Sequence, residues 1–307
     1  MDLSRELLIQ AARIRLVEQR IIELYPSDLI QSPVHLSIGQ EASAVGLCAA
    51  LRADDLLFPN YRGHAHYLAR GGELDLFFAE LMGRITGVSK GKAGSMHLAS
   101  PQHGVMGASA VVASSISHAV GSALAERIKG PSDRVFVTVF GDGATEQGTF
   151  FESLNFASLH KLPVLFLCED NSLAVHTGLA ERQAFSLGRV AEAFGVGFYS
   201  QDHGFDPLAV YKSTGPVLDH LRNGNGPAVL RVETMRYREH VGPGEDFDAD
   251  YRSREAVEEW KKLDPLEGDL GDIEDALKEI RNEIDAAVKF AMESDAPGIE
   301  ELLTDVL

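Results

Sequence analysis

Apolar residues recur at two kinds of spacing along this chain, and the two spacings predict different elements. Steps of three and four residues over positions 4–24 predict an amphipathic helix, and the same period over 273–292 predicts another near the end of the chain. Nearly continuous apolar runs at 134–140 and 162–168 are typical of strands buried on both faces. Such strands occur in parallel sheets covered by helices, so we expect an α/β fold.

The segment between these two runs has helical spacing from 147 to 160, which predicts a strand–helix–strand unit with a right-handed crossover. Two further apolar runs, at 196–200 and 228–233, are candidates for additional strands of the same sheet. No internal repeat, low-complexity tract or linker divides the sequence. We therefore expect one α/β domain over 1–307, extended by the N-terminal helix and by an acidic helical section over 253–307.

Charge and composition narrow the class of protein. The 307 residues carry a net charge of −18, from 28 basic and 46 acidic side chains, and such a surface repels the phosphate backbone of nucleic acids. The acidic residues concentrate after Glu245, where they are typical of a solvated helical face. Two cysteines cannot form a disulfide framework, and we see neither a secretory signal nor an apolar run of membrane-spanning length. We therefore expect a cytoplasmic protein.

Polar side chains follow both of the predicted central strands. The first strand leads into Gly-Asp-Gly at 141–143, and the second leads into Glu-Asp-Asn at 169–171. The carboxyl ends of parallel strands share one edge of a sheet, which is where α/β proteins bind ligands. Asp142 and Asn171 offer the oxygen ligands that Mg²⁺ prefers, and a helix beginning after the first triplet would direct its N–H groups at a phosphate. The sequence therefore predicts a magnesium–diphosphate site.

Two other phosphate-binding motifs fit this stretch less well. A dinucleotide fingerprint would need glycine where Glu146 stands, and a P-loop would need lysine where Thr149 stands. The Gly-Asp-Gly triplet is a weak signal by itself, because any turn after a strand can have this composition. Its separation from Asn171 strengthens the signal, because one crossover helix fills the gap.

The two triplets and the helix between them resemble the thiamine diphosphate signature, in which GDG is followed by a helix and a strand that ends in NN. Over about residues 5–266 the chain resembles the α subunit of the E1 component of 2-oxo acid dehydrogenases, the pyruvate and acetoin dehydrogenase group. Further matching segments stand in the family's order: His35–Ala42, Tyr61–His64, Lys90–His97, Gly104–Ala108, Tyr251-Arg252 and Asp264-Pro265. The resemblance implies a three-layer thiamine diphosphate-binding fold, with a mostly parallel central sheet and helical extensions at both ends.

The resemblance also implies roles for individual residues. The metal ligands would be the side chains of Asp142 and Asn171 and the carbonyl of Leu173. His240 is expected to orient the diphosphate or the substrate and to move protons, and His64 is a second catalytic candidate. An ordinary loop histidine is the alternative for each. Besides Asp142, Asn171 and His240, the expected contacts to the cofactor are Tyr61, Arg62, Gly143 and Ala144 around the diphosphate, and main-chain groups of Gly104 and Met106 at the aminopyrimidine.

Three positions depart from the family pattern. Asp170 replaces the first Asn of the signature, but the metal ligand is the following Asn171, so we expect binding to survive. Val241 stands where animal members have a regulatory serine, which argues against phosphorylation control. The loop 242–250 differs from the usual one and borders the expected site, so the sequence does not identify the substrate.

The resemblance implies an E1 enzyme that uses thiamine diphosphate and Mg²⁺ to decarboxylate a 2-oxo acid and transfers the acyl group to lipoamide or another acceptor. In this family a separate β chain supplies the glutamate needed for ylide formation, so we expect an α₂β₂ assembly, with a lipoyl E2 acyltransferase as a further partner. One alternative is a transketolase-like or acyloin-forming carboligase on the same scaffold, which the loop 242–250 keeps open. Another is a non-catalytic binding subunit, which the presence of Asp142, Asn171 and Arg62 disfavours.

Overall fold

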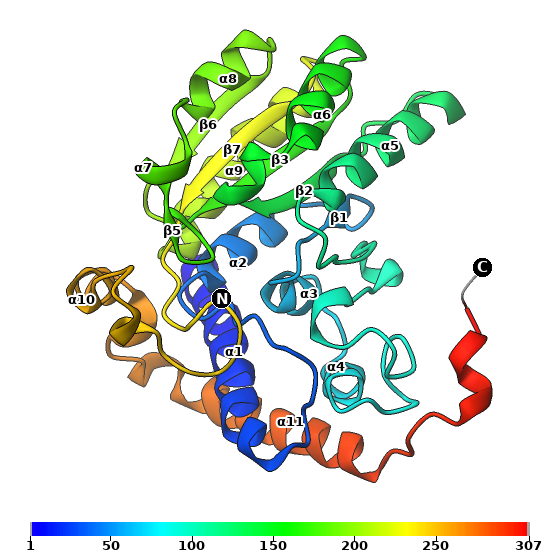
Figure 1. The fold of residues 1–307 in the computed structure, drawn as a ribbon, viewed down its shortest axis with the longest axis vertical. Coiled ribbons are helices and arrows are strands. Elements are labelled where there is room, and N and C mark those ends of the chain that lie inside the picture. Colours follow the sequence, from blue (N-terminus) through cyan, green and yellow to red (C-terminus); the bar gives the residue numbers. More distant parts are fainter. Residues whose placement is uncertain (1, 306–307) are drawn as a thin grey trace.

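The centre of the molecule is a five-stranded sheet in which every strand runs parallel to its neighbours (Figure 1). The structure is a computed structural model and describes residues 2–305. The middle strand of the sheet, β3 (Val164–Asp170), pairs with β2 (Phe136–Gly141) on one side and with β7 (Ala228–Glu233) on the other. The strands lie in the order β1 (Leu56–Phe58), β2 (Phe136–Gly141), β3 (Val164–Asp170), β7 (Ala228–Glu233) and β6 (Gly197–Gln201).

Helices cover both faces of this sheet, because successive residues of each strand point to opposite faces and both faces are apolar. On one face, Phe136 and Phe140 of β2 pack in a cluster with residues of α5, α6 and α8. On the other face, Val137 and Val139 pack with residues of α2 and α9. These helices are α2 (Glu41–Ala50), α5 (Ser114–Lys129), α6 (Gly148–Leu159), α8 (Leu187–Ala193) and α9 (Pro207–Arg222).

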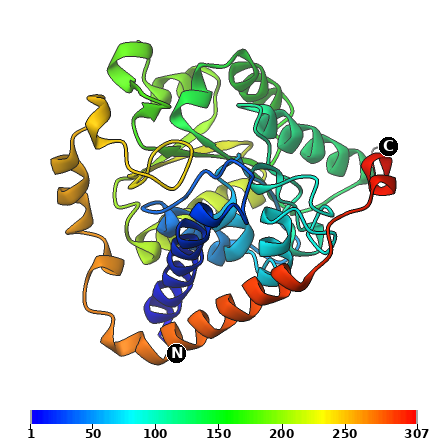
Figure 2. The same ribbon diagram turned by 60° about the horizontal axis from the view of Figure 1, so that its bottom comes forward.

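A further helical layer packs beside the sheet and contains the largest apolar cluster. Residues from both ends of the chain meet in it, and Figure 2 shows α11 running along the outside of the molecule. A two-stranded hairpin of β4 (Leu173–Ala174) and β5 (Thr177–Gly178) follows β3. The remaining helices are α1 (Leu3–Leu24), α3 (His64–Ala69), α4 (Leu74–Leu81), α7 (Leu179–Arg182), α10 (Arg254–Lys261) and α11 (Glu274–Glu293).

The α/β fold with a central parallel sheet is confirmed, and each predicted strand is present within a few residues of its expected position. One local expectation was wrong. No α-helix begins directly after the triplet 141–143, because a 3-10 turn over Asp142–Glu146 comes first and α6 begins at Gly148. The main-chain N–H groups nearest the strand end therefore belong to this turn rather than to a full helix.

No helix within residues 2–305 is both long enough and apolar enough to span a membrane.

Candidate active site

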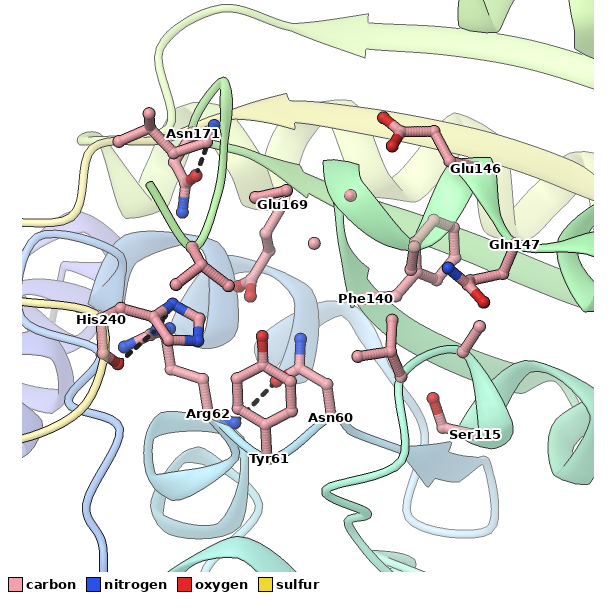
Figure 3. Close-up of a pocket in the computed structure, with 18 of the residues that line it drawn as sticks. Asn60, Tyr61, Arg62, Ser115, Phe140, Glu146, Gln147, Glu169, Asn171 and His240 are labelled. Carbon is pink, nitrogen blue, oxygen red and sulfur yellow. Dashed lines mark hydrogen bonds between the residues drawn. The ribbon is translucent and has the colours of Figure 1, made fainter. Parts of the chain in front are cut away.

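A cavity of about 260 Å³ opens at the carboxyl edge of the sheet, where β2 and β3 end (Figure 3). In the close-up, Asn171, Glu169, Arg62 and His240 lie around one side of the cavity, and Phe140 and Gln147 lie on the other. The wall therefore combines segments that are far apart in the sequence. Other lining residues are Gln40, Asn60, Tyr61, Ser109, Val111, Val112, Gly141, Gly143, Ala144, Glu146, Leu173, Ala174 and Val175.

The two triplets that follow β2 and β3 lie against each other. Gly141 is directly opposite Glu169 in the parallel register. A Cβ atom on Gly143 would come within 2.8 Å of the Cβ of Ala174, so only glycine allows the turn to approach the segment after Asn171 this closely. The sequence prediction that both strand ends contribute to one place is therefore consistent with the structure.

The side chain of Asp142 is buried and uses only one of its two carboxylate oxygens. Its Oδ2 pairs with Arg182, whereas its Oδ1 has no hydrogen-bond partner among the described residues. Burial raises the pKa of this carboxyl to about 6, with a further contribution from nearby Asp170 and an opposing one from Arg182. A buried carboxylate oxygen without a donor is unfavourable in a folded chain, and a bound cation would satisfy it.

Asn171 is already oriented by local hydrogen bonds. Its Oδ1 accepts a bond of 3.1 Å from the N–H of Leu173, and its Nδ2 donates to Oε1 of Gln40 at 3.3 Å. The amide oxygen has a second lone pair that these bonds leave free. No three His, Cys, Asp or Glu side chains within 2–305 are grouped to hold a metal, but the predicted ligand set contains only one such side chain.

The charge that Asp170 adds to this edge has its own counter-ion. Its Oδ2 accepts a bond of 2.6 Å from Nε of Arg231 on the neighbouring strand β7. Its Oδ1 accepts from the N–H of Ser172 at 2.9 Å. The carboxylate at the position where this sequence departs from the signature is therefore neutralised from outside the cavity.

Arg62 provides a buried cation in the cavity wall. It donates to the carbonyl oxygens of Leu36, at 2.7 Å, and His240, at 3.2 Å, and no carboxylate of residues 2–305 lies within 4.0 Å of its guanidinium. Burial, with repulsion from Arg236, lowers the pKa of Arg62 to about 10, so the group stays charged at neutral pH. A buried guanidinium without a counter-ion favours an anionic ligand.

His240 lies beside Arg62 and packs with two other rings. Its ring centroid is 5.3 Å from that of His35 and 5.9 Å from that of Tyr61. Burial, and then the charges of Arg62 and Arg236, lower the pKa of His240 to about 4. The imidazole is therefore neutral at pH 7, a state in which one ring nitrogen donates and the other accepts.

Four of the predicted site residues are not among those that line the cavity: Asp142, which lies between the lining residues Gly141 and Gly143, and His64, Gly104 and Met106. His64 is fully buried, with Nδ1 bonded to Glu18 at 2.9 Å and Nε2 bonded to Ser95 at 2.7 Å. Gly104 and Met106 flank β1, where their main-chain groups bond to Leu57: the Leu57 N–H donates to the Gly104 carbonyl at 2.8 Å, and the Met106 N–H donates to the Leu57 carbonyl at 2.9 Å. The structure thus brings the residues around 141–144, 171–173, 61–62 and 240 together, whereas His64, Gly104 and Met106 do not line the cavity.

Sequence analysis missed two charged residues of this region. Glu169 is buried beside the cavity, and burial raises the pKa of its carboxyl to about 7. Its place at the end of a predicted strand could have indicated it. Arg182 bonds to Asp142 from the four-residue helix α7, and no pattern in the sequence indicates that this short helix returns to the strand end.

Residues 9–300 of the chain match the family model described as the dehydrogenase E1 component. The chain therefore belongs to the dehydrogenase E1 component family, whose members are thiamine diphosphate-dependent oxidoreductases.

Individual relatives cover almost the whole chain. The α subunit of acetoin:2,6-dichlorophenolindophenol oxidoreductase from Bacillus subtilis is 37% identical over 95% of this chain and 90% of its own length. The pyruvate dehydrogenase E1 component subunit alpha of Rhizobium meliloti is 37% identical over 99% of this chain and 88% of its own length. The protein of the same name from Zymomonas mobilis is 36% identical, with 96% and 85% covered.

Proposed function

We propose that this chain is the α subunit of a 2-oxo acid dehydrogenase, which decarboxylates a 2-oxo acid and transfers the acyl group to lipoamide or another acceptor. One observation carries the proposal. Arg62, a buried guanidinium without a counter-ion, lines the cavity, and Asp142, which has a buried carboxylate oxygen without a partner, lies between the lining residues Gly141 and Gly143. This pair of unsatisfied charges is complementary to a divalent cation and a diphosphate.

The described residues fit thiamine diphosphate with Mg²⁺. The side chains of Asp142 and Asn171 and the carbonyl of Leu173 would hold the metal, since all three are oxygen donors. When bound, thiamine diphosphate supplies the carbon nucleophile and the electron sink for decarboxylation. The remaining contacts that we propose are Gly143, Ala144, Tyr61 and Arg62 at the diphosphate, and main-chain groups of Gly104 and Met106, which flank β1, at the aminopyrimidine.

Three further residues of the chain have separate roles in this proposal. Arg62 binds the anionic tail, and its contact with the His240 carbonyl holds the loop that carries this histidine. His240, neutral at pH 7, can accept or donate a proton at the cavity wall. His64 is enclosed by Glu18 and Ser95, so we assign it to holding the Ser95 loop in place rather than to proton transfer.

We also propose that the active site is completed by a β subunit in an α₂β₂ assembly. Both the Bacillus and the Rhizobium relatives are named as α subunits. Four valines around the cavity are exposed by 44–68%, which is typical of an apolar rim that a partner covers: Val111, Val112, Val175 and Val241. A lipoyl E2 acyltransferase is the further partner, and the two free, buried cysteines are consistent with a cytoplasmic location.

Reconstitution tests this proposal directly. The chain is combined with an E1 β chain from the same organism, thiamine diphosphate and Mg²⁺, and offered pyruvate and branched 2-oxo acids. We expect CO₂ release coupled to reduction of 2,6-dichlorophenolindophenol, and loss of both in Asp142→Asn, which removes the charged metal ligand. Calorimetry that detects no binding of thiamine diphosphate with β present would contradict the proposal and favour a non-catalytic subunit.

Acetoin oxidation is the second candidate activity. The Bacillus relative named for acetoin is as similar in sequence as the Rhizobium pyruvate dehydrogenase subunit, at 37% identity in both cases. Dye reduction with acetoin but without CO₂ release from any 2-oxo acid would favour it. Carboligation products formed with an aldehyde acceptor, without the use of lipoamide, would instead favour a ligase on the same scaffold.

A further inference from the structure

The two carboxylate oxygens of Asp142 have different surroundings. Oδ1 is buried and has no hydrogen-bond partner among residues 2–305, whereas Oδ2 is bonded to the guanidinium of Arg182. The same guanidinium bonds Glu146 through its other terminal nitrogen, and its Nε donates to the carbonyl of Thr177 at 3.3 Å. Only 9% of the Arg182 side chain is exposed. A planar group with its donors committed in three directions has little rotational freedom.

Arg182 connects the two segments that carry the proposed metal ligands. It ends α7, which directly follows the β4–β5 hairpin that begins at Leu173. The adjacent Gln183 donates from Nε2 to Oγ1 of Thr145 at 2.8 Å, and this hydroxyl in turn donates to the main-chain carbonyl of Asp142 at 2.7 Å. The segment that follows the hairpin is thus fixed to the turn after β2 by the side chains of both Arg182 and Gln183.

We propose that Arg182 is a positioning residue of the metal site: it holds one oxygen of Asp142 so that the other stays free for a divalent cation. This inference rests on the proposed function. Arg182 is absent from the residues that line the cavity, whereas Glu146, its second anchor, is among them. Asp142 lies between Gly141 and Gly143, which line the cavity, and Oδ1 is the oxygen that the guanidinium leaves without a partner among residues 2–305. Residues that orient metal ligands in this way commonly change metal affinity by ~10–100-fold when they are removed.

Simple electrostatics makes the opposite prediction. A guanidinium close to a metal ligand repels a divalent cation, so its removal would strengthen metal binding if charge alone mattered. Arg231 provides the matched control for this effect. It donates to Oδ2 of Asp170 at 2.6 Å from the other side of the same edge, and Asp170 is not a proposed ligand. Weaker metal binding after the removal of Arg182 therefore indicates positioning, whereas stronger binding indicates charge repulsion.

The experiment measures Mn²⁺ binding to the reconstituted complex with its β chain at saturating thiamine diphosphate, from the electron paramagnetic resonance signal of free Mn²⁺. We expect Arg182→Gln to weaken Mn²⁺ binding at least tenfold and Arg182→Lys to weaken it less, because an ammonium makes one of the two terminal contacts. We expect Arg231→Gln to bind Mn²⁺ equally or more tightly. Unchanged or tighter binding in Arg182→Gln would overturn the inference.

A second variant keeps the test decisive if Arg182→Gln does not fold, as judged by its thermal unfolding without metal. Glu146→Gln removes the other anchor of Arg182 but retains the guanidinium, and we expect a smaller loss of Mn²⁺ affinity in the same direction. No loss in that variant would contradict positioning. If the wild-type complex binds no Mn²⁺, the proposed function itself fails, which distinguishes that failure from a failure of this inference alone.

Discussion

Two buried arginines in this molecule have opposite surroundings. Arg15, in the helical layer, bonds to carboxylates on three sides: Glu41, Asp264 at 2.9 Å and Glu267 at 2.8 Å. Arg62, at the cavity, bonds to carbonyl oxygens but to no carboxylate within residues 2–305. In the first arrangement the buried cation is paired with carboxylates, and the network holds the fold together. The second is incomplete, and an incomplete buried charge is the feature that distinguishes a ligand site from a structural network.

The largest effect that would test this contrast is the loss of Arg15. We expect Arg15→Met to lower the free energy of unfolding by ~3–5 kcal/mol, because Glu41 and Asp264 would remain buried without their counter-ion. Urea denaturation of the purified chain measures this. The control is Arg13→Gln, which breaks a partly exposed pair with Glu283 and should cost no more than ~1 kcal/mol. Equal losses in the two variants would contradict the contrast.

Arg62 should respond in the opposite way. We expect Arg62→Gln to leave the free energy of unfolding unchanged or higher, because the substitution removes a buried charge without a counter-ion. It should weaken thiamine diphosphate binding by ~10–100-fold, the equivalent of one charge-assisted hydrogen bond of ~1.5–3 kcal/mol. Calorimetry on the complex with β and urea denaturation of the chain measure the two quantities. Destabilisation without any loss of cofactor affinity would make Arg62 a structural residue.

The pH dependence of stability tests a third buried group, His66. Neither ring nitrogen of His66 has a hydrogen-bond partner within residues 2–305, and burial lowers the pKa of this histidine to about 4. Between pH 4 and 6.5 the unfolded chain therefore binds more protons here than the folded chain, so stability falls as the pH falls through this range. At pH 5 the loss relative to neutral pH is ~2 kcal/mol for a group shifted this far.

The test for His66 compares the pH dependence of stability in wild type and in a variant without this histidine. Glu169, whose Oε1 lies 3.7 Å from Nε2 of His66, has a raised pKa and its effect on stability runs in the opposite direction over the same range. We therefore compare the loss of unfolding free energy from pH 7 to pH 5 in wild type and in His66→Gln. The variant should lose less, by roughly the amount above. An identical loss in both would show that His66 does not titrate in this range.

The smallest expected effect concerns an exposed pair. Lys90 bonds to Glu301 at 2.9 Å and contacts Asp305 at 3.0 Å, near the carboxyl end of the described chain. We expect Lys90→Gln to lower the free energy of unfolding less than Arg15→Met does, because solvent screens exposed pairs. Urea denaturation at low and high salt measures this. The difference from wild type should shrink with salt, and a large, salt-independent loss would place the pair among the structural networks instead.

The parallel sheet and its functional edge could be predicted from the sequence because burial on both faces leaves a distinct pattern. Continuous apolar runs such as Val164–Cys168 need cover on both sides, and a strand–helix–strand unit then fixes which ends lie together. The polar triplets after the runs were therefore visible as a candidate site. The family resemblance then associated that edge with a cofactor class.

The elements that were missed have weak local patterns. β1 has three residues, and α9 contains Pro216 within its helical span. Histidine roles were equally hidden, because His64 and His240 both follow family motifs while only the structure shows one enclosed and the other at the cavity. The role of Arg182 could not be predicted from the sequence, because it depends on the position of a four-residue helix in the folded chain. Long-range packing, rather than local preference, decides each of these cases.

The sheet order has a consequence for how the chain is made. β2 precedes β3 in the sequence, so one edge of β3 can pair as soon as β3 is synthesised. The other edge pairs with β7, which begins only at Ala228. At ~5–20 residues per second, a ribosome needs several seconds to add the intervening segment. During that time the central strand of the sheet has an unpaired backbone edge, which is a template for aggregation. Slower translation or a missing chaperone should therefore reduce the yield of this protein more than that of one whose central strand is closed by its neighbours in sequence.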